Sequence, residues 1–427
     1  MNRNQFLKTL GAFAGSTVLS KPVFADFSGL EKQLNQQTND DTFWKLVRDQ
    51  FLFPGDYTYL NTGGIGAIPL LVLNKVKATM DKVEIYPRPG HDQEQWLEMK
   101  EKCSYLLGRG CRKEELAFTS TATEGINIVI NGLDLKEGDE VITSTHEHPA
   151  LHIPLLNQAL TRKVLVKTFH PDLESGLGNV QIIRDLITKK TRLIFISHVT
   201  CTTGQVFPLK EIAQMAKSKD IIFAVDGAQA AGQISLQLKE WGVDCYVFSG
   251  HKWVLGPRRT GVLYVCEDRM EMIRPTTVGA YSDNGYDVEK RDLSFHPTAQ
   301  RYEYGTQNEA LFYGLGTGAD FIQTIGIEKT EEHNRKLAEQ FYKGLKNIPV
   351  IQVLSPEEEQ YRSAIISFRS SEHDHTGLAA YLSEKRIRVR VVPEAGLDGI
   401  RVSFHIYNNE KDVDRILNEI IAFINSN

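Results

Sequence analysis

The sequence contains few cysteines. Only five occur among 427 residues, and no pair has the C-x-x-C spacing typical of a zinc site. Five is also an odd number, and the spacing of the cysteines shows no disulfide pattern. We therefore expect each cysteine to be buried as a small apolar residue. The five are Cys103, Cys111, Cys201, Cys245 and Cys266. The sequence therefore predicts neither a disulfide framework nor a metal site.

Long apolar runs and dense blocks of one charge are missing as well. After the N-terminus no segment reaches about 18 uninterrupted apolar residues, the length that predicts a transmembrane helix. The formal net charge is −5, and no block rich in lysine and arginine offers a surface to nucleic acid or lipid. We expect no membrane span and no nucleic-acid partner.

Residues 1–25 are typical of an export signal. Arg3 and Lys8 make a basic start, Leu10–Leu19 is apolar, and Val23–Ala25 offers a cleavage site. The string Arg3–Lys8 resembles a twin-arginine motif in which asparagine replaces the second arginine. The sequence predicts a periplasmic or exported protein, with a twin-arginine-like route as one option. The alternative is an amphipathic helix retained in a cytoplasmic protein.

A chain of 427 residues is long enough for two cores. Between residues 115 and 265 short apolar runs alternate with helical patterns, which predicts an α/β domain with a mainly parallel, seven-stranded sheet between helices. The expected strands are Leu116–Thr119, Val141–Thr143, Val164–Thr168, Leu193–Ser197, Ile221–Val225, Cys245–Phe248 and Gly261–Val265. Ligands of such sheets bind at the carboxyl ends of the strands.

After about residue 301 the pattern changes to that of a smaller α+β domain. A helical pattern covers Asn308–Leu345, short strands are expected at Val350–Leu354, Ser363–Phe368, Arg386–Val392 and Ile400–Ser403, and a last helix at Glu410–Ile424. We expect an N-terminal arm at 26–60, a large domain at 61–300 and a small domain at 301–427.

The strongest candidate site follows the strand that ends near Phe248. It reads Ser249-Gly250-His251-Lys252-Trp253. A lysine normally lies on a solvated face, but Lys252 follows a buried strand, where burial lowers its pKa and favours the free amine that a Schiff base requires.

Asp226 and Gln229 end an earlier strand. Asp226 could simply cap a helix, and without context that interpretation is the better one. With a lysine 26 positions later, the carboxylate also fits a role in keeping a pyridine nitrogen protonated, as pyridoxal-5'-phosphate (PLP) enzymes require. Gln229 could bond the ring hydroxyl.

Thr121–Gly125 lies between an expected strand and a helix. The backbone N–H groups of Ala122 and Thr123, with the threonine hydroxyl and the helix dipole, could bind a phosphate. A plain capping role for Thr123 accounts for the same residues equally well.

His146 and His148 follow the second expected strand. A zinc role lacks a third ligand at a typical spacing, and a ring stacked on a planar cofactor fits His148 better. Ser197 and His198 end another strand, where a structural role in the turn is as good an interpretation as a catalytic one.

Two later residues complete the set. Thr306 lies in a short polar turn that could reach a phosphate in a partner subunit. Arg401 ends an apolar strand, where its guanidinium could hold a substrate carboxylate through two hydrogen bonds or could pair with an internal acid.

Six motifs in this order resemble the class V aminotransferases, the group that includes cysteine desulfurases and isopenicillin N epimerase. They are F-T-S-T-A-T-E-G-I-N, H-E-H-P-A, A-V-D-G-A-Q, F-S-G-H-K-W-V-L-G-P, E-Y-G-T-Q-N and G-I-R-V-S-F-H-I-Y-N, and the likeness covers most of the chain after Tyr59. The resemblance implies the type I fold of PLP enzymes, PLP as cofactor, and a homodimer.

The resemblance also implies roles for individual residues. Lys252 would carry PLP as a Schiff base, Asp226 would face the pyridine nitrogen, Gln229 the ring hydroxyl and His148 the ring face. Thr123, Ser249 and His251 would bind the phosphate with Thr306 of a partner subunit, and Arg401 would hold the substrate carboxylate. Asn61, in the turn Leu60–Gly64, would lie on the substrate side, although a plain turn asparagine is an equal alternative.

Two features depart from the desulfurases. Their nucleophilic cysteine belongs in the loop before the substrate arginine, but this chain has no cysteine after Cys266, and the matching stretch Val391–Asp398 contains none. Cys201 stands where many desulfurases have an asparagine, and we favour a packing role for it over a catalytic thiol. The chain is more similar to the epimerase branch and to exported members that tailor siderophores.

We therefore expect a PLP enzyme that acts at the α-carbon of an amino acid, or of an amino-acid end group, as a transaminase or epimerase. A C–S lyase or other elimination enzyme is one alternative, because these reactions share their early steps. A non-catalytic exported binding protein of the same fold is the other.

Overall fold

The computed structural model describes residues 27–426, so the predicted export signal lies outside the described residues. The predicted N-terminal arm contains helices α2 (Phe27–Asn35) and α3 (Asp40–Arg48) and the short strand β1 (Thr58–Tyr59). Across residues 27–426, no helix is both long and apolar enough for a membrane crossing.

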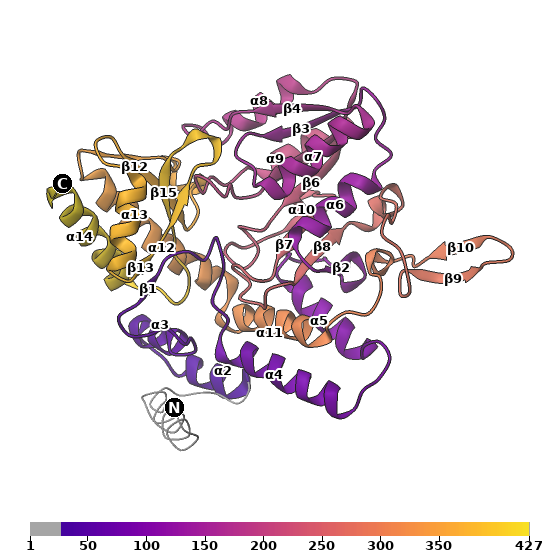
Figure 1. Cartoon of the computed structure of the whole chain (residues 1–427), viewed down its shortest axis with the longest axis horizontal. Helices are drawn as coiled ribbons and strands as arrows, with labels where there is room; N and C mark the ends of the chain where they lie inside the picture. Colours follow the sequence, from indigo (N-terminus) through magenta and orange to yellow (C-terminus); the bar gives the residue numbers. More distant parts are fainter. Residues whose placement is uncertain (1–26, 427) are drawn as a thin grey trace, which may run out of the picture.

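A seven-stranded sheet forms the centre of the molecule (Figure 1). Its order is β2-β8-β7-β6-β5-β3-β4; β8 runs antiparallel to both of its neighbours, and the other pairs are parallel. The strands are β2 (Leu116–Thr119), β3 (Glu140–Ser144), β4 (Leu165–Phe169), β5 (Thr191–Ser197), β6 (Ile222–Asp226), β7 (Cys245–Ser249) and β8 (Gly261–Val265). The predicted mainly parallel, seven-stranded α/β sheet is confirmed.

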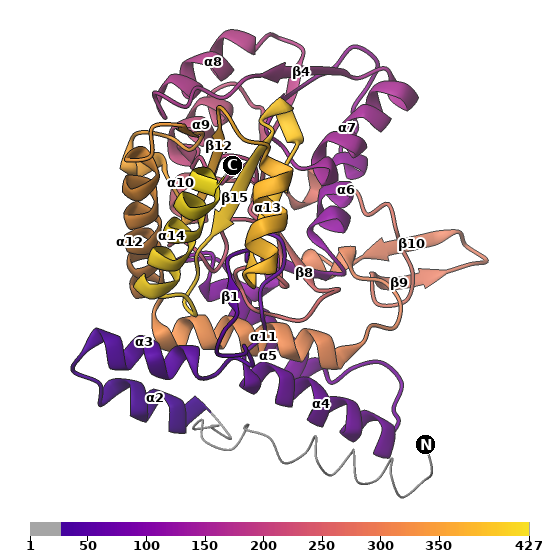
Figure 2. The same ribbon diagram turned by 60° about the vertical axis from the view of Figure 1, so that its left-hand side comes forward.

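Helices cover both faces of this sheet because its central strands are apolar on both sides. In β6, Ile222 and Ala224 pack on the face covered by α6 (Ala122–Gly132) and α7 (Pro149–Arg162). Phe223 and Val225 pack on the opposite face, with α5 (Gln93–Tyr105), α9 (Leu209–Lys217) and α11 (Glu309–Ile325). Figures 1 and 2 show these two helical layers.

The remaining helices of this part are shorter or peripheral. They are α4 (Leu70–Ile85), α8 (Gly178–Leu186), α10 (Leu238–Trp241) and the 3-10 turns η1 (Lys113–Glu115), η2 (Glu267–Met272) and η3 (Ala299–Tyr302). Strands β9 (Asp283–Asp287) and β10 (Asp292–Phe295) form a hairpin that projects from the body in Figure 1.

The predicted helical region at 308–345 is two helices. Helix α11 ends at Gly326, whose φ of +95° suits glycine, and α12 (Ile327–Lys346) begins there. Helix α11 packs on α4 and α5 and shares the core of the large sheet. The domain boundary at residue 300 stays a prediction.

The C-terminal part is a second, smaller layer of α+β structure. A four-stranded antiparallel sheet has the order β11-β12-β15-β14, and α12, α13 and α14 pack against it. Its elements are β11 (Ile351–Val353), η4 (Glu359–Tyr361), β12 (Ile365–Ser370), α13 (His375–Glu384), β14 (Arg390–Val392), η5 (Glu394–Gly396), β15 (Gly399–Ser403) and α14 (Glu410–Ser426).

One predicted strand, Arg386–Val392, is wrong as a single element. Its first half is β13 (Ile387–Arg388), which pairs in parallel with β1 of the N-terminal arm. Its second half is β14, which pairs with β15. The chain changes partner at the buried Val389, so one continuous extended segment contributes to two sheets.

Candidate active site

The carboxyl ends of β3, β5, β6 and β7 meet at one edge of the large sheet. Ser197 and Asp226 are direct register partners at the ends of β5 and β6. Strand β7 ends at Ser249, and Lys252 follows it by three residues. Parallel strands therefore bring together side chains that lie far apart in the sequence.

Lys252 is half-buried on the loop after β7. Its Nζ makes no hydrogen bond or ion pair to another residue of the described chain. Burial lowers the pKa of Lys252 below its ordinary value, and the nearby Asp226 carboxylate opposes this effect. The site thus holds an amine with an increased neutral fraction, as a nucleophile or proton carrier requires.

The early turn at 61–66 packs closely against this loop. The Gly66 N–H donates to the carbonyl of His251 at 2.7 Å, and a Cβ on Gly66 would lie 2.0 Å from the carbonyl oxygen of Lys252. Only glycine allows this approach, so the turn carrying Asn61 is held at the site.

Asp226 is 5% exposed, and its Oδ1 accepts a hydrogen bond from the Ala228 N–H at 2.9 Å. Burial raises its pKa above the ordinary value, while the Lys252 ammonium lowers it. Among the described residues, its Oδ2 makes no hydrogen bond. One carboxylate oxygen therefore stays available for a further donor.

Gln229 is buried and uses both ends of its amide within the chain. Its Nε2 donates to the Gly63 carbonyl and its Oε1 accepts from the Trp253 indole, both at 2.9 Å. A contact with a ring hydroxyl stays a prediction. What the structure shows is that Gln229 ties the early turn to the Lys252 loop.

The first turn of α6 lies beside Ser249. The N–H of Ala122 donates to Ser249 Oγ at 3.4 Å, and Thr123 is exposed at the next position. The capping interpretation of Thr123 is wrong, because Thr121 is the cap and its Oγ1 accepts from the Glu124 N–H at 3.2 Å. The helix start presents backbone donors suited to an anion.

His148 begins α7, where its Nδ1 accepts from the Ala150 N–H at 3.1 Å. Burial lowers its pKa to about 4, and the charge of Lys252 adds to this. The ring is therefore neutral near pH 7 and faces the same cluster. Stacking on a cofactor stays a prediction.

The other histidine of the pair has a different role. His146 is buried, and its Nδ1 shares a hydrogen bond of 3.0 Å with the Thr202 hydroxyl. Over residues 27–426, no group of three His, Cys, Asp or Glu side chains is arranged to hold a metal ion.

Glu147 is a site residue that sequence reasoning missed. Its carboxyl is 2% exposed and accepts from the hydroxyls of Ser144 and Ser197 and from the Ser197 N–H at 2.9 Å. Burial raises the pKa of Glu147 to about 7, and the Asp226 charge adds to the rise. Its position between the two histidines, after a buried strand, was the available signal.

Arg401 lies on β15 and is 1% exposed. Its Nη1 donates to the Cys201 carbonyl at 2.6 Å and its Nη2 to Asn61 Oδ1 at 3.3 Å. No acid of the described chain forms an ion pair with it, so the interpretation as an internal ion pair is wrong. Burial lowers its pKa to about 10.

Cys201 is buried beside this cluster. Burial raises the pKa of its thiol to about 11, so the group is a neutral thiol near pH 7. His198 is buried under Asp226: its N–H donates to the Asp226 carbonyl at 2.8 Å, and its Nδ1 shares a hydrogen bond with the Tyr246 hydroxyl. These contacts give His198 a structural place in the turn.

Thr306 is not brought into the cluster by any contact within the chain. It is exposed in the loop between η3 and α11, and no hydrogen bond joins it to the other predicted residues of the described chain. Its contribution to a partner's site stays a prediction.

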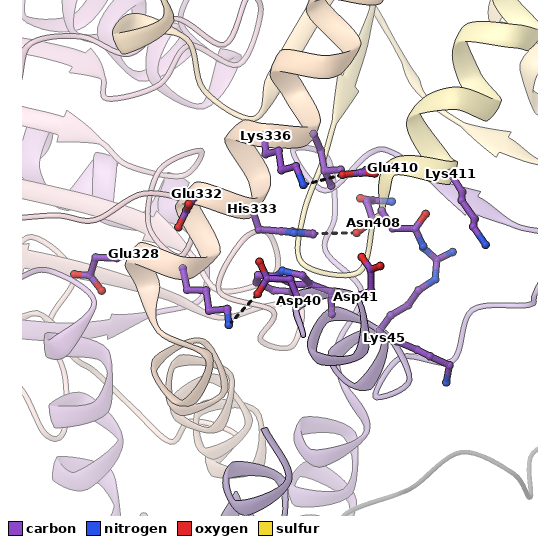
Figure 3. Close-up of a pocket in the computed structure, with 15 residues that line it drawn as sticks. Asp40, Asp41, Lys45, Glu328, Glu332, His333, Lys336, Asn408, Glu410 and Lys411 are labelled. Atoms are coloured by element: carbon purple, nitrogen blue, oxygen red, sulfur yellow. Dashed lines mark hydrogen bonds and ion pairs between the residues drawn. The ribbon is translucent and has the colours of Figure 1, made fainter. Parts of the chain in front are cut away.

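A separate cavity lies between α3, α12 and the start of α14 (Figure 3). Its volume is about 760 Å³ and it is lined by acidic and basic side chains, such as Lys336 and Glu410, which pair at 2.8 Å. His333 stacks on Trp44 there, with ring centroids 3.8 Å apart. None of the predicted site residues lines this cavity.

The cluster at the sheet edge fits PLP. Its unengaged polar atoms include Lys252 Nζ, Asp226 Oδ2 and two buried atoms without a hydrogen-bond partner in the described chain, His251 Nδ1 and Arg401 Nε. The free amine matches the aldehyde of PLP, and the available carboxylate oxygen matches its pyridine nitrogen. The helix start matches its phosphate.

Comparisons with known proteins agree with this geometry. The chain is 28% identical to the isopenicillin N epimerase of Amycolatopsis lactamdurans over 391 residues, which cover 88% of this chain and 97% of that protein. It is 28% identical to a cysteine desulfurase of Serratia proteamaculans over 337 residues, covering 75% and 80% of the two chains.

Solved structures share the fold. The apo cysteine desulfurase of Thermococcus onnurineus superimposes with a TM-score of 0.80 over 90% of this chain and 98% of that one, at 24% identity. A mutant of C-DES with glycine covalently linked to the PLP cofactor has a TM-score of 0.81 and 26% identity, covering 87% and 98%. The family model described as aminotransferase class V matches residues 86–416, so the chain belongs to the class V aminotransferase family of PLP-dependent enzymes.

Proposed function

We propose that the protein uses PLP to act at the α-carbon of an amino acid, or of an amino-acid end group on a larger metabolite, as an epimerase or aminotransferase. The observation that carries this proposal is the Lys252 amine, which has no hydrogen-bond partner in the described chain and on which Asp226, Arg401 and the buried Cys201 act electrostatically. A persulfide route through a mobile cysteine has no residue to support it, because the stretch Val391–Asp398 contains no cysteine.

When bound, PLP supplies an electron sink that makes the α-proton of an attached amino acid acidic. Lys252 would hold the cofactor through its amine, and the same amine would take the α-proton of the substrate and return it. Burial lowers the pKa of Lys252, which increases the fraction of neutral amine that can accept a proton.

Other residues prepare this proton transfer. Asp226 would hold a proton on the ring nitrogen of the cofactor, and its burial would keep water from competing for that contact. Arg401 orients the carboxylate of the substrate. The start of α6, with Ser249 and His251, would bind the phosphate.

The likeness to isopenicillin N epimerase supports the epimerase branch, because it extends over 97% of that protein. A second candidate is elimination. The fold neighbour C-DES is a cystine C-S lyase, solved with its product cysteine persulfide at 26% identity and a TM-score of 0.79. An elimination begins with the same loss of the α-proton.

The test incubates the PLP-loaded protein with a panel of amino acids and amine-bearing metabolites in D₂O. We expect deuterium at the α-carbon of at least one compound, with inversion for an epimerase or a 2-oxo acid and aminated cofactor for an aminotransferase. Ammonia with a 2-oxo acid indicates elimination. Cofactor retention without any α-proton exchange would overturn the proposal in favour of a binding protein.

We also propose a homodimer in which Thr306 reaches the phosphate of the partner's cofactor. Support comes from its exposed position on a polar loop. Light scattering should give about twice the mass of one chain, and Thr306→Ala should release PLP faster without dissociating the dimer. A fully loaded monomer would contradict this proposal.

A further inference from the structure

Strand pairing places two arginines side by side at the site. Arg390 on β14 is the direct register partner of Arg401 on β15. Opposed residues of an antiparallel pair point to the same face, and two like charges there repel each other. The position of Arg390 therefore needs a compensating group.

That group is Glu394, in η5 four residues further on. Arg390 Nη2 and Glu394 Oε1 form an ion pair, and the two side chains are 27% and 18% exposed. Burial would raise the pKa of Glu394, but the hydrogen bond from Arg390 brings it below the ordinary value. The carboxylate is therefore ionised near pH 7.

Both charges border the space around the free lysine. The charge of Arg390 lowers the pKa of Lys252 and of His148, and that of Glu394 raises the pKa of His148. Both also act on the Cys201 thiol. The pair thus lies close enough to the cluster at the sheet edge for its charges to act on Lys252, His148 and Cys201.

Each member of the pair has one atom left over. Arg390 Nη1, a donor, and Glu394 Oε2, an acceptor, are closed to solvent and have no hydrogen-bond partner among residues 27–426. Buried polar groups are nearly always paired, and an unpaired one is costly. A ligand that supplies an acceptor and a donor together would satisfy both atoms.

We propose that Arg390 and Glu394 recognise the far end of the substrate side chain, and that this end is an amide, either a carboxamide or a peptide bond. The inference rests on the proposed function as an amino-acid enzyme. A carboxylate would be attracted by Arg390 but repelled by Glu394. An ammonium group would be attracted by Glu394 but repelled by Arg390. A hydrocarbon would leave both atoms unpaired.

The experiment titrates the PLP-loaded protein with L-glutamine and with L-glutamate, which have nearly the same shape, and follows the cofactor absorbance band. The wild type should bind glutamine about tenfold more tightly. Adding γ-L-glutamylglycine distinguishes a peptide amide from a carboxamide: tighter binding than glutamine assigns the peptide bond.

Glu394→Gln reverses the expected preference. It leaves Arg390 uncompensated, so glutamate should gain at least about tenfold relative to glutamine. Glu98→Gln removes one charge from an exposed ion pair with Lys102, on α5, and should leave the ratio unchanged. Arg390→Gln should weaken glutamate further, which provides a second test if Glu394→Gln fails to load PLP.

The two proposals fail in different ways. The inference is overturned if the wild type prefers glutamate, if Glu394→Gln leaves the ratio unchanged, or if other amino acids shift the band while the amide probes do not. If no amino acid shifts the band or exchanges its α-proton, the proposed function itself fails.

Discussion

Asp226 is the residue at which burial of a carboxylate bears most directly on the proposed catalysis. Its carboxylate is buried, holds one backbone hydrogen bond and lies near the Lys252 amine. Asp226→Asn should keep PLP bound, because the phosphate contacts are elsewhere, but lower turnover by about two orders of magnitude or more.

Absorbance of the loaded variant and its turnover number check this prediction together. Asp244→Asn is a matched control, since Asp244 is also partly buried but binds the Phe223 N–H and Arg269 outside the site. It should alter stability and leave the turnover of folded protein unchanged. An Asp226→Asn enzyme of nearly normal rate would remove the pyridine role.

Arg401 has a structural as well as a binding task. It holds the Cys201 carbonyl and the Asn61 side chain, so Arg401→Ala should lower the melting temperature as well as raise KM. We expect kcat/KM to fall by about ten- to a hundredfold for a carboxylate substrate. The corresponding amine, which lacks the carboxylate, should lose less; equal losses would show that the carboxylate is held elsewhere.

At this scale the sequence indicated which polar residues lie at or just after strand ends. Lys252, Asp226, Gln229 and Ser249 could be recognised because each follows an apolar run, where a polar side chain is conspicuous. The role proposed for Arg390 could not be predicted, because it depends on the pairing of Arg390 with Arg401 across two strands, and register is not visible in one sequence. Arginines alternate with apolar residues from Arg386 to Arg390, so Arg390 does not stand out there.

Among the elements, the loop after β3 is held in place by an unusual set of hydrogen bonds. Glu147 ties it to β3 and β5 through three donors, with no cation among its hydrogen-bond partners. In the folded protein the pKa of Glu147 is about 7. Between the ordinary pKa of about 4.5 and pH 7, the folded protein therefore keeps a proton on Glu147 that the unfolded chain releases. The group therefore destabilises the fold increasingly as the pH rises from about 4.5 to 7.

Glu147→Gln should remove this dependence, because the amide stays neutral and can still bond both serines. We expect the variant to gain stability relative to wild type between pH 5 and pH 8, on the order of 2–3 kcal/mol. Denaturant unfolding at the two pH values measures the gain. Glu289→Gln, on the exposed hairpin tip, is the control. A difference between variant and wild type that does not change with pH would contradict the account.

The seven strands of the large sheet could all be predicted within one or two residues, because buried parallel strands are short, continuous apolar runs. The order of the strands could not, nor could the division of the run 386–392 between β13 and β14. That division depends on β1, which lies more than 300 residues earlier and pairs with β13. Gly326, which separates α11 from α12, also reads as an ordinary helical position in an apolar pattern.

For the whole molecule, buried histidines set the acid limit of stability. Burial lowers the pKa of four of them to about 4, namely His146, His148, His251 and His333, and of His198 and His405 to about 3. The pKa of each of these histidines is lower in the folded than in the unfolded chain. The stability that they contribute is therefore fully present above about pH 6.5 and is lost as the pH falls toward 4. The raised pKa values of Glu147, Asp226 and Asp244 oppose this, but the six histidines outnumber the three carboxyl groups.

The melting temperature should therefore fall by more than about 5 °C between pH 6.5 and pH 4.5. Circular dichroism at a series of pH values checks this, with the cofactor kept saturating so that its release does not contribute. A melting temperature that stays level or rises over this interval would show that the histidines are not neutral and buried.

The central claim is that Lys252 carries the cofactor, since the proton transfer, the role of Asp226 and the substrate-side residues all follow from it. The direct measurement is borohydride reduction of the PLP-loaded protein followed by peptide mass mapping. The account predicts a phosphopyridoxyl group on the peptide containing Lys252 and none in Lys252→Ala. An adduct on another lysine of the wild type, or unchanged covalent loading of Lys252→Ala, would contradict it.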